Sequence, residues 1–167
     1  MPNKSPERIV GIDPGYDRLG IAVIERTKSA KKERLLYSTC IQTSPRDDIY
    51  TRLLSIGRAV AAVLEEYQPT VLALETLFIT KNQKTAMRVA EARGIIIFEA
   101  IQRKIAVFEY GPMEIKLAIT GDGSSDKLRV TKMVNLLVDN PPQQALDDEY
   151  DAVAVALTQS ARHRLVG

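Results

Sequence analysis

The segment RIVGIDPGYDRLGIAVIER, residues 8–26, decides the fold of this chain. Its two β-branched runs, RIVGID at 8–13 and LGIAVIER at 19–26, are typical of strands, and the Pro-Gly pair between them signals a turn. After a polar and basic stretch, LLYSTCIQ at 35–42 returns to the strand pattern. We therefore expect the chain to open with three antiparallel strands.

Helical and strand patterns alternate after residue 42. VLALET at 71–76 is a short apolar run typical of a buried central strand, and IAVFEY at 105–110 is expected to follow it as a parallel strand after a helical crossover. The helical patterns cover 47–67, 82–104, 112–119, 126–138 and 146–164. The sequence predicts an α/β domain over residues 1–167, with a mixed five-stranded sheet, three antiparallel strands and then parallel strands, flanked by helices.

Composition excludes several classes of protein. The 167 residues are 45% apolar without a run of about 20 apolar positions, so neither a disordered chain nor a membrane protein is expected. The first eight residues lack the apolar core of a signal peptide, and Cys40 and His163 are single, which excludes a disulfide framework and a zinc site rich in cysteine or histidine. We expect a cytoplasmic protein, and the net charge of +2 alone argues against a strongly basic nucleic-acid binder.

Several acidic residues stand where folding alone would not place them. Asp13 and Glu75 end the two most apolar strand patterns, where an ionised carboxylate is costly unless a positive group compensates it. In the last helical pattern, Asp148 and Asp151 share a face at i, i+3, and Asp147 and Asp151 could share one at i, i+4. Each acid alone could be a turn residue, a helix-dipole charge or half of a salt bridge. Together they suit a hard cation such as Mg²⁺ or Mn²⁺, which prefers oxygen ligands.

Four blocks of the chain resemble the RuvC-type crossover junction endodeoxyribonucleases, the Holliday junction resolvases of ribonuclease-H-like fold. The blocks occur in the family's order and span most of the chain: GIDPGYDRLGIAVIE (11–25), ALETLFITKNQKTAMRVAEARG (73–94), PMEIKLAITGDGSSDKLRVTKMV (112–134) and DEYDAVAVALT (148–158). The second block, with ETLF, KN and EARG, is the most specific of the four.

The resemblance implies an activity and a cofactor. The family's four catalytic acids fall on Asp13, Glu75, Asp148 and Asp151, which would bind two Mg²⁺ ions, with Mn²⁺ able to substitute. The expected reaction is hydrolysis of a phosphodiester at paired, symmetric positions of a four-way DNA junction, leaving 5′-phosphate and 3′-hydroxyl ends, in recombination and repair. If four carboxylates are committed to metal, the net charge of the rest rises from +2 to +6, which suits DNA better.

The same resemblance assigns DNA contacts. It makes Phe78 an exposed wedge that stacks on a base at the crossover, whereas composition alone favours a core aromatic. The basic side chains expected to hold DNA phosphates are Lys81, Lys84, Arg88, Lys116 and Lys127. A run of basic residues is otherwise simply a solvated face.

The family's paired cuts imply a C2 homodimer. In the helix expected at 82–104, an apolar stripe could supply part of the interface or pack on its own sheet: Met87, Ala90, Gly94, Ile97 and Ile101. A branch-migration motor such as the RuvAB complex is a candidate further partner. Two alternatives stay open: a ribonuclease-H-like nuclease acting on RNA–DNA hybrids, and a junction-binding protein that does not cleave. DPGYDRLG also resembles the phosphate-binding hairpin of actin-like ATPases and sugar kinases, but those proteins need a far longer chain.

Overall fold

The structure is a computed structural model that describes residues 6–26, 31–76 and 83–166, with side chains described as far as residue 162. Its centre is one sheet of six strands in the order β5-β4-β1-β2-β3-β6. The strands are β1 (Glu7–Asp13), β2 (Arg18–Arg26), β3 (Glu33–Gln42), β4 (Val71–Glu75), β5 (Ala106–Tyr110) and β6 (Val138–Asp139).

The pairing of the strands confirms the predicted fold class. β1, β2 and β3 form the antiparallel series, and β4 and β5 join the other side of β1 in parallel. The predicted number of five strands is wrong, because Val138 and Asp139 form a sixth strand parallel to β3 where the sequence predicted the end of a helix. A two-residue strand has no periodicity to detect; it is defined only by its pairing with Glu33 and Arg34.

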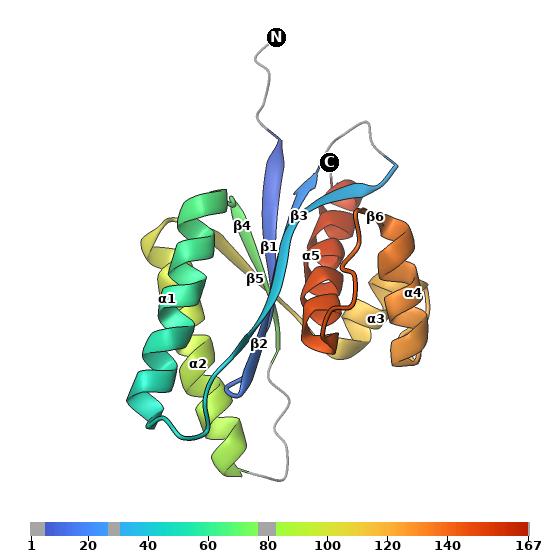
Figure 1. Cartoon of the computed structure of the whole chain (residues 1–167). Coiled ribbons are helices and arrows are strands. Elements are labelled where there is room, and N and C mark those ends of the chain that lie inside the picture. The colour runs from blue at the N-terminus through green and yellow to red at the C-terminus, as the bar shows by residue number, and fades with distance from the viewer. Residues whose placement is uncertain (1–5, 27–30, 77–82, 167) are drawn as a thin grey trace.

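Five helices cover the two faces of the sheet. They are α1 (Ile49–Tyr67), α2 (Gln83–Gln102), α3 (Pro112–Thr120), α4 (Lys127–Leu137) and α5 (Asp147–Val166). Figure 1 shows α1 and α2 on one face and α3, α4 and α5 on the other. None of the helices in the described part of the chain is long and apolar enough to cross a membrane.

Side-chain alternation along β1 divides the core between the two faces. Ile9 belongs to the apolar cluster under α5, whereas Val10 and Ile12 belong to the cluster under α1 and α2. Because both faces are covered, the buried middle of β1, residues 9–12, contains no polar side chain, whereas a strand with one exposed face would alternate.

Two glycines let α5 lie directly on the sheet. A Cβ added to Gly11 would lie 2.2 Å from the carbonyl oxygen of Ala152, and one added to Gly20 would lie 2.0 Å from the carbonyl oxygen of Asp148. No side chain fits such distances, so glycine is required where these backbones meet. The close approach brings the first turns of α5 down to the strands.

Candidate active site

Asp13 and Glu75 lie side by side at one edge of the sheet. β1 and β4 are neighbouring parallel strands in which Ile12 pairs with Leu74, and each acid is the next and last residue of its strand. Parallel strands end at the same edge, so their carboxyl groups meet there.

The first turns of α5 bring the remaining acids to this edge. Asp13 pairs with Gly20 across the β1–β2 hairpin, and Gly20 lies beneath the backbone of Asp148. Asp151 is one turn further along α5 and lines the same pocket as Asp13 and Glu75. The structure thus brings together the four acids that the sequence predicted, from three elements that are distant in the chain.

Burial and mutual repulsion raise the pKa values of the two strand-end acids. The pKa of Asp13 rises to about 8, first because of its burial and then because of the charges of Glu75, Asp151 and Asp148. Burial also raises the pKa of Glu75, and the two side chains share a hydrogen bond. Such a bond between two carboxyl groups needs one proton, so below the raised pKa of Asp13 the pair holds one negative charge rather than two.

Lys127, the first residue of α4, lies against the acids of α5. Its Nζ is 3.0 Å from Oδ2 of Asp151 and 3.3 Å from Oδ2 of Asp147. Burial raises the pKa of Asp151, and the nearby ammonium of Lys127 opposes that effect. Asp147 is 74% exposed at its side chain, against 20% for Asp148, so of the two candidates it is Asp148 that faces the buried cluster.

Two groups beside Asp148 were not predicted from the sequence. Nη1 of Arg18, at the start of β2, is 3.6 Å from Oδ2 of Asp148. Burial and the charge of Asp148 raise the pKa of the Cys40 thiol, on β3, to about 11. Arg18 belongs to the PGYDR segment, which the sequence marks only as a turn, and only the folded arrangement shows that it approaches the acids.

The acids open into a pocket of about 280 Å³. Lys116 of α3 and Lys127 line it together with Asp13, Glu75 and Asp151. Apolar side chains of α3, α4 and α5 form the rest of the wall. The pocket therefore places positive ammonium groups next to clustered carboxylates, as a site for a phosphate and a cation requires.

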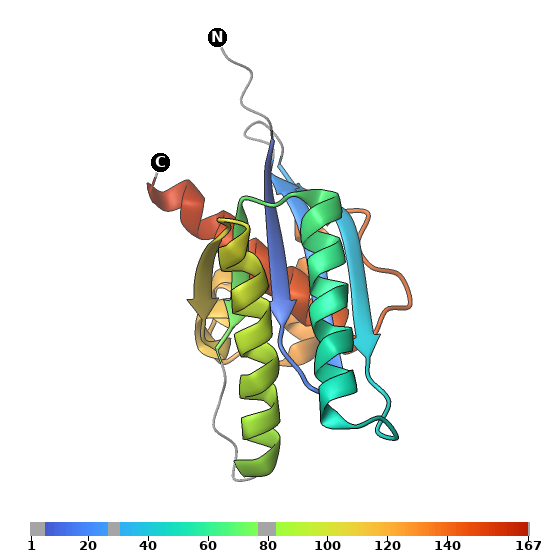
Figure 2. The same cartoon turned by 90° about the vertical axis from the view of Figure 1, so that its left-hand side faces the viewer.

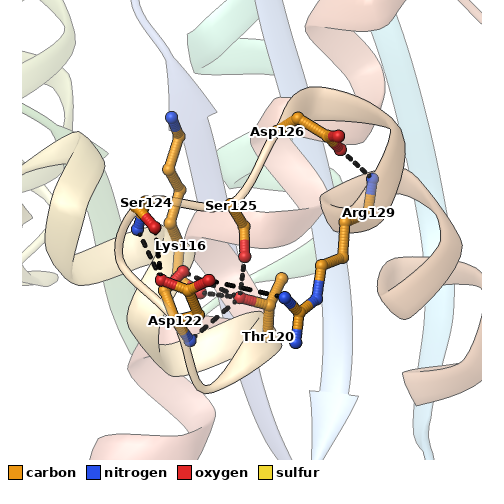
Figure 3. A network of polar contacts seen from close by, with 7 residues as sticks. All are labelled: Lys116, Thr120, Asp122, Ser124, Ser125, Asp126 and Arg129. Carbon is orange, nitrogen blue, oxygen red and sulfur yellow. Dashed lines mark hydrogen bonds and ion pairs between the residues drawn. The ribbon is translucent and has the colours of Figure 1, made fainter.

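A network of polar contacts holds the connection between α3, which carries Lys116, and α4 (Figure 3). Thr120 Oγ1 is 2.8 Å from the carbonyl oxygen of Lys116, 2.9 Å from that of Asp122 and 2.6 Å from Oγ of the buried Ser125. Either hydroxyl can donate in the bond between Thr120 and Ser125, and the one proton of Thr120 can serve only one of its acceptors. This network fixes the end of α3 against the loop that leads to Lys127.

The remaining predicted DNA contacts lie on or before α2. Lys84 is exposed, and Arg88, one turn later, is paired with Glu91 at 2.9 Å. Figure 2 shows the start of α2 projecting beyond the edge at which β1 ends. Phe78 and Lys81 lie outside the described residues.

The outer face of α2 carries an apolar stripe that differs by one position from the predicted one. Ile97 packs against the core cluster shared with α1, and Phe98 is exposed in its place. Burial of Ala92, Ile96 and Ala100 against the sheet sets this rotation of the helix. The exposed stripe consists of Met87, Ala90, Gly94, Phe98 and Ile101.

The acid cluster fits a hard cation by its chemistry. Its donors are carboxylate oxygens, and the shared proton of Asp13 and Glu75 marks a deficit of positive charge. Within the described ranges, no three His, Cys, Asp or Glu side chains are already grouped closely enough to hold a metal ion. The side-chain contacts explain this, because Asp151 is turned to Lys127 and Asp148 to Arg18, so a cation would have to draw the carboxylates together.

Comparisons with known proteins identify the family of this chain. The family model described as crossover junction endodeoxyribonuclease RuvC matches residues 9–159. The RuvC of Brachyspira hyodysenteriae is 42% identical over 156 residues, covering 93% of this chain and 95% of that protein, and the RuvC of Caldicellulosiruptor saccharolyticus is 39% identical over 150 residues, covering 90% of each. The structure of Thermus thermophilus RuvC in complex with Holliday junction substrate superposes with a TM-score of 0.88 at 32% identity, covering 96% of both chains. This chain belongs to the RuvC family of crossover junction endodeoxyribonucleases.

Proposed function

We propose that this chain is a Holliday junction resolvase that cuts two strands of a four-way DNA junction at symmetric positions. One observation carries the proposal: three of the clustered acids, Asp13, Glu75 and Asp151, share a pocket with Lys116 and Lys127. A phosphodiester entering this pocket would meet carboxylates that can hold cations and ammonium groups that can pair with its charge. Membership in the RuvC family supports a junction over an RNA–DNA hybrid as the substrate.

The four acids would hold two Mg²⁺ ions, for which Mn²⁺ could substitute. When bound, such ions supply activation of the attacking water and stabilisation of the charge on the leaving oxygen. Asp13 and Glu75 hold their carboxylates rigidly at strand ends, while Asp148 and Asp151 approach from α5. The proton that Asp13 and Glu75 share must be released when both bind cations, so we expect cation binding to be stronger at higher pH.

The basic residues around the pocket would hold the DNA backbone. Lys116 and Lys127 are positioned for phosphates at the cleavage site, and Lys84 and Arg88 for phosphates further along the strand. We assign base stacking to Phe78 and a phosphate contact to Lys81 on the sequence resemblance alone. Because these contacts are ionic, junction affinity should fall as salt concentration rises.

Paired cuts need two sites, which we assign to a C2 homodimer. The exposed stripe of α2 offers an apolar face for the second copy; Phe98 and Ile101 are 61% and 62% exposed. Replacing Phe98 by Asp should give a monomer in sedimentation experiments that nicks without pairing its cuts. We also propose that the enzyme acts in the cytoplasm and that a branch-migration motor such as RuvAB presents the junction to it.

A digestion experiment tests the proposed function. The protein is incubated with Mg²⁺ and either a synthetic mobile junction or an RNA–DNA hybrid duplex of the same sequence. We expect symmetric nicks in the junction that DNA ligase reseals, because the products carry 5′-phosphate and 3′-hydroxyl ends. Preferential cleavage of the hybrid would assign the site to another ribonuclease-H-like activity, and binding without cleavage would make the chain a junction-binding protein.

A further inference from the structure

Arg93, on α2, is a nearly buried cation that contacts the backbone at the end of β4, where Glu75 lies. Its side chain is 11% exposed, and it belongs to the EARG run at 91–94. Nη1 donates a hydrogen bond to the backbone carbonyl oxygen of Glu75, and Nη2 is 3.1 Å from Oε2 of Glu109 on β5. The guanidinium thus bridges α2, the end of β4 and β5.

These contacts suit arginine and no other side chain. A buried cation is costly unless its donors are satisfied, and the planar guanidinium serves two acceptors in a fixed geometry, whereas a lysine ammonium acts as a single point charge. Glu75 is the last residue of β4, after which the chain leaves the sheet; Thr76 donates its N–H to the carbonyl oxygen of Tyr110 at 2.9 Å. Arg93 and Tyr110 therefore fix the backbone on both sides of the Glu75–Thr76 peptide bond.

We propose that Arg93 is a positioning residue, which holds the backbone of Glu75 so that its carboxylate points to the cations and to the scissile phosphate. The proposal rests on the function proposed above, in which Glu75 binds metal. The next residue, Gly94, lies on the exposed stripe of α2, with open space where a Cβ would be. A second copy packed on that stripe would steady the same turn of α2 that holds Glu75.

The test compares Arg93 with an arginine just beyond the end of the same helix. Arg103, in the turn directly after α2, also donates from Nη1 to a backbone carbonyl, that of Glu99, at 3.0 Å, and is ion-paired with the Glu99 carboxylate. Arg93→Gln and Arg103→Gln therefore remove the same chemistry, but only the first removes it beside the acids. Thermal unfolding is followed across a Mg²⁺ titration, and junction cleavage is measured as a single-turnover rate together with junction Kd.

Arg93→Gln should raise the Mg²⁺ concentration that gives half of the maximal Tm shift by about tenfold, and should lower the cleavage rate by about 10- to 100-fold. Junction Kd should change by less than about threefold, because the phosphate-binding side chains are intact. Arg103→Gln should leave the Mg²⁺ midpoint at the wild-type value. Arg93→Lys keeps the positive charge but loses the planar pair of donors, so its Mg²⁺ midpoint should lie between those of the wild type and Arg93→Gln. The same variant takes the place of Arg93→Gln if that protein does not fold.

Equal Mg²⁺ midpoints for the Arg93 and Arg103 variants would overturn the proposal, whatever their effects on Tm. A shifted midpoint in Arg93→Gln together with wild-type protein that cleaves no junction would uphold the positioning role and overturn the proposed function. The experiment can therefore contradict the positioning role of Arg93 and the proposed function independently of each other.

Discussion

At the two ends of the β1–β2 hairpin, the acidic residues of the strands have neighbours of opposite charge. Where β1 begins and β2 ends, each acid has an arginine: Glu7 is 3.0 Å from Arg26, and Glu25 is 3.2 Å from Arg8. Where β1 ends, Asp13 has another acid as its neighbour, and none of the ion pairs between described residues includes it.

This difference separates charges that stabilise the fold from charges that the fold tolerates. Glu25 is 13% exposed, and Arg8 and Arg34 both compensate it, so its burial costs little. Asp13 is held where its charged form is disfavoured, and a sequence optimised for stability would replace it. An acid left in this way marks the end of the hairpin at which a ligand must supply the positive charge.

The two substitutions Glu75→Gln and Glu25→Gln change one acid at each end of the sheet. They should differ more in cleavage activity than any other pair of variants proposed here. Glu75→Gln removes a proposed ligand charge but keeps the shape, so cleavage should fall by at least about 100-fold while junction binding survives. Without metal its Tm should equal or exceed that of the wild type, because the repulsion between Glu75 and the neighbouring acids is removed. Glu25→Gln loses its ion pairs and should lower stability by about 1 kcal/mol with cleavage unchanged.

Cleavage assays at saturating Mg²⁺ and thermal melts in EDTA measure both effects. Full cleavage by Glu75→Gln would remove Glu75 from the site. A loss of stability of the same size in both variants would mean that the two ends do not differ in the way their charges are compensated.

Gly20→Ala should have the next largest effect on cleavage, because it displaces α5 from the acid edge, the edge of the sheet at which Asp13 and Glu75 lie. Its Cβ would lie 2.0 Å from the backbone oxygen of Asp148, so the helix itself must shift. Overpacking of this kind costs about 1–3 kcal/mol, and cleavage should fall about tenfold or more because Asp148 and Asp151 move with the helix.

Gly57→Ala is the matched control. Its Cβ would meet only the Cγ2 of Ile95, at 3.1 Å, on the opposite face of the sheet. That side chain can yield, and alanine favours the helix, so stability and cleavage should stay close to those of the wild type. Denaturant melts and cleavage rates of the two variants would then differ; equal rates would show that α5 need not lie so close to β2.

Between about pH 5 and pH 8, the pH dependence of stability should come chiefly from the acid end. The pKa of Asp13 is about 8 in the folded protein against 3.8 as its ordinary value, so folding favours the protonated carboxyl. Its contribution is intact below about pH 4 and is lost as the pH rises to about 8. The metal-free Tm should therefore fall between about pH 5 and pH 8, and Mg²⁺ should raise the Tm more at the higher pH.

Asp13→Asn should flatten this dependence, whereas Glu25→Gln should keep it. Calorimetry in EDTA across the pH range measures both slopes. An unchanged slope in Asp13→Asn would assign the titration to other groups.

The sequence predicted the acid edge in part because strand ends can be located without a structure. Asp13 and Glu75 follow apolar runs typical of buried strands, so each could be placed at a strand end. That the two strands are parallel neighbours is shown only by the structure. The choice between Asp147 and Asp148 needed the rotation of α5, which Gly11 and Gly20 set through contacts with its backbone. Periodicity alone carries no such information.

Contacts between distant segments explain the remaining differences. Arg18 and Arg93 reach the acids through side chains whose direction only tertiary packing defines. Likewise, Ile97 and Phe98 are equally apolar in sequence, and the packing of α2 on the sheet decides which one faces outward. Patterns locate elements and candidate acids, whereas the charges that surround the acids depend on the fold.

Substitution of Thr120 should have the smallest effect on cleavage, because Thr120 acts on the basic wall of the pocket, formed by Lys116 and Lys127, rather than on the acids. Thr120→Val keeps the shape but leaves the buried Ser125 hydroxyl without this hydrogen-bond partner, which costs about 1–3 kcal/mol and loosens the connection between α3 and α4. We expect a loss of cleavage of a few fold, which Thr120→Ser restores because it keeps the hydroxyl. In a Lys116→Gln, Lys127→Gln background, Thr120→Val should lower stability as before but have no further effect on cleavage, because the groups that it aligns are gone. An additive loss of cleavage in that background would mean that the network supports the acid edge directly, and the division between the acids and the basic wall would then be wrong.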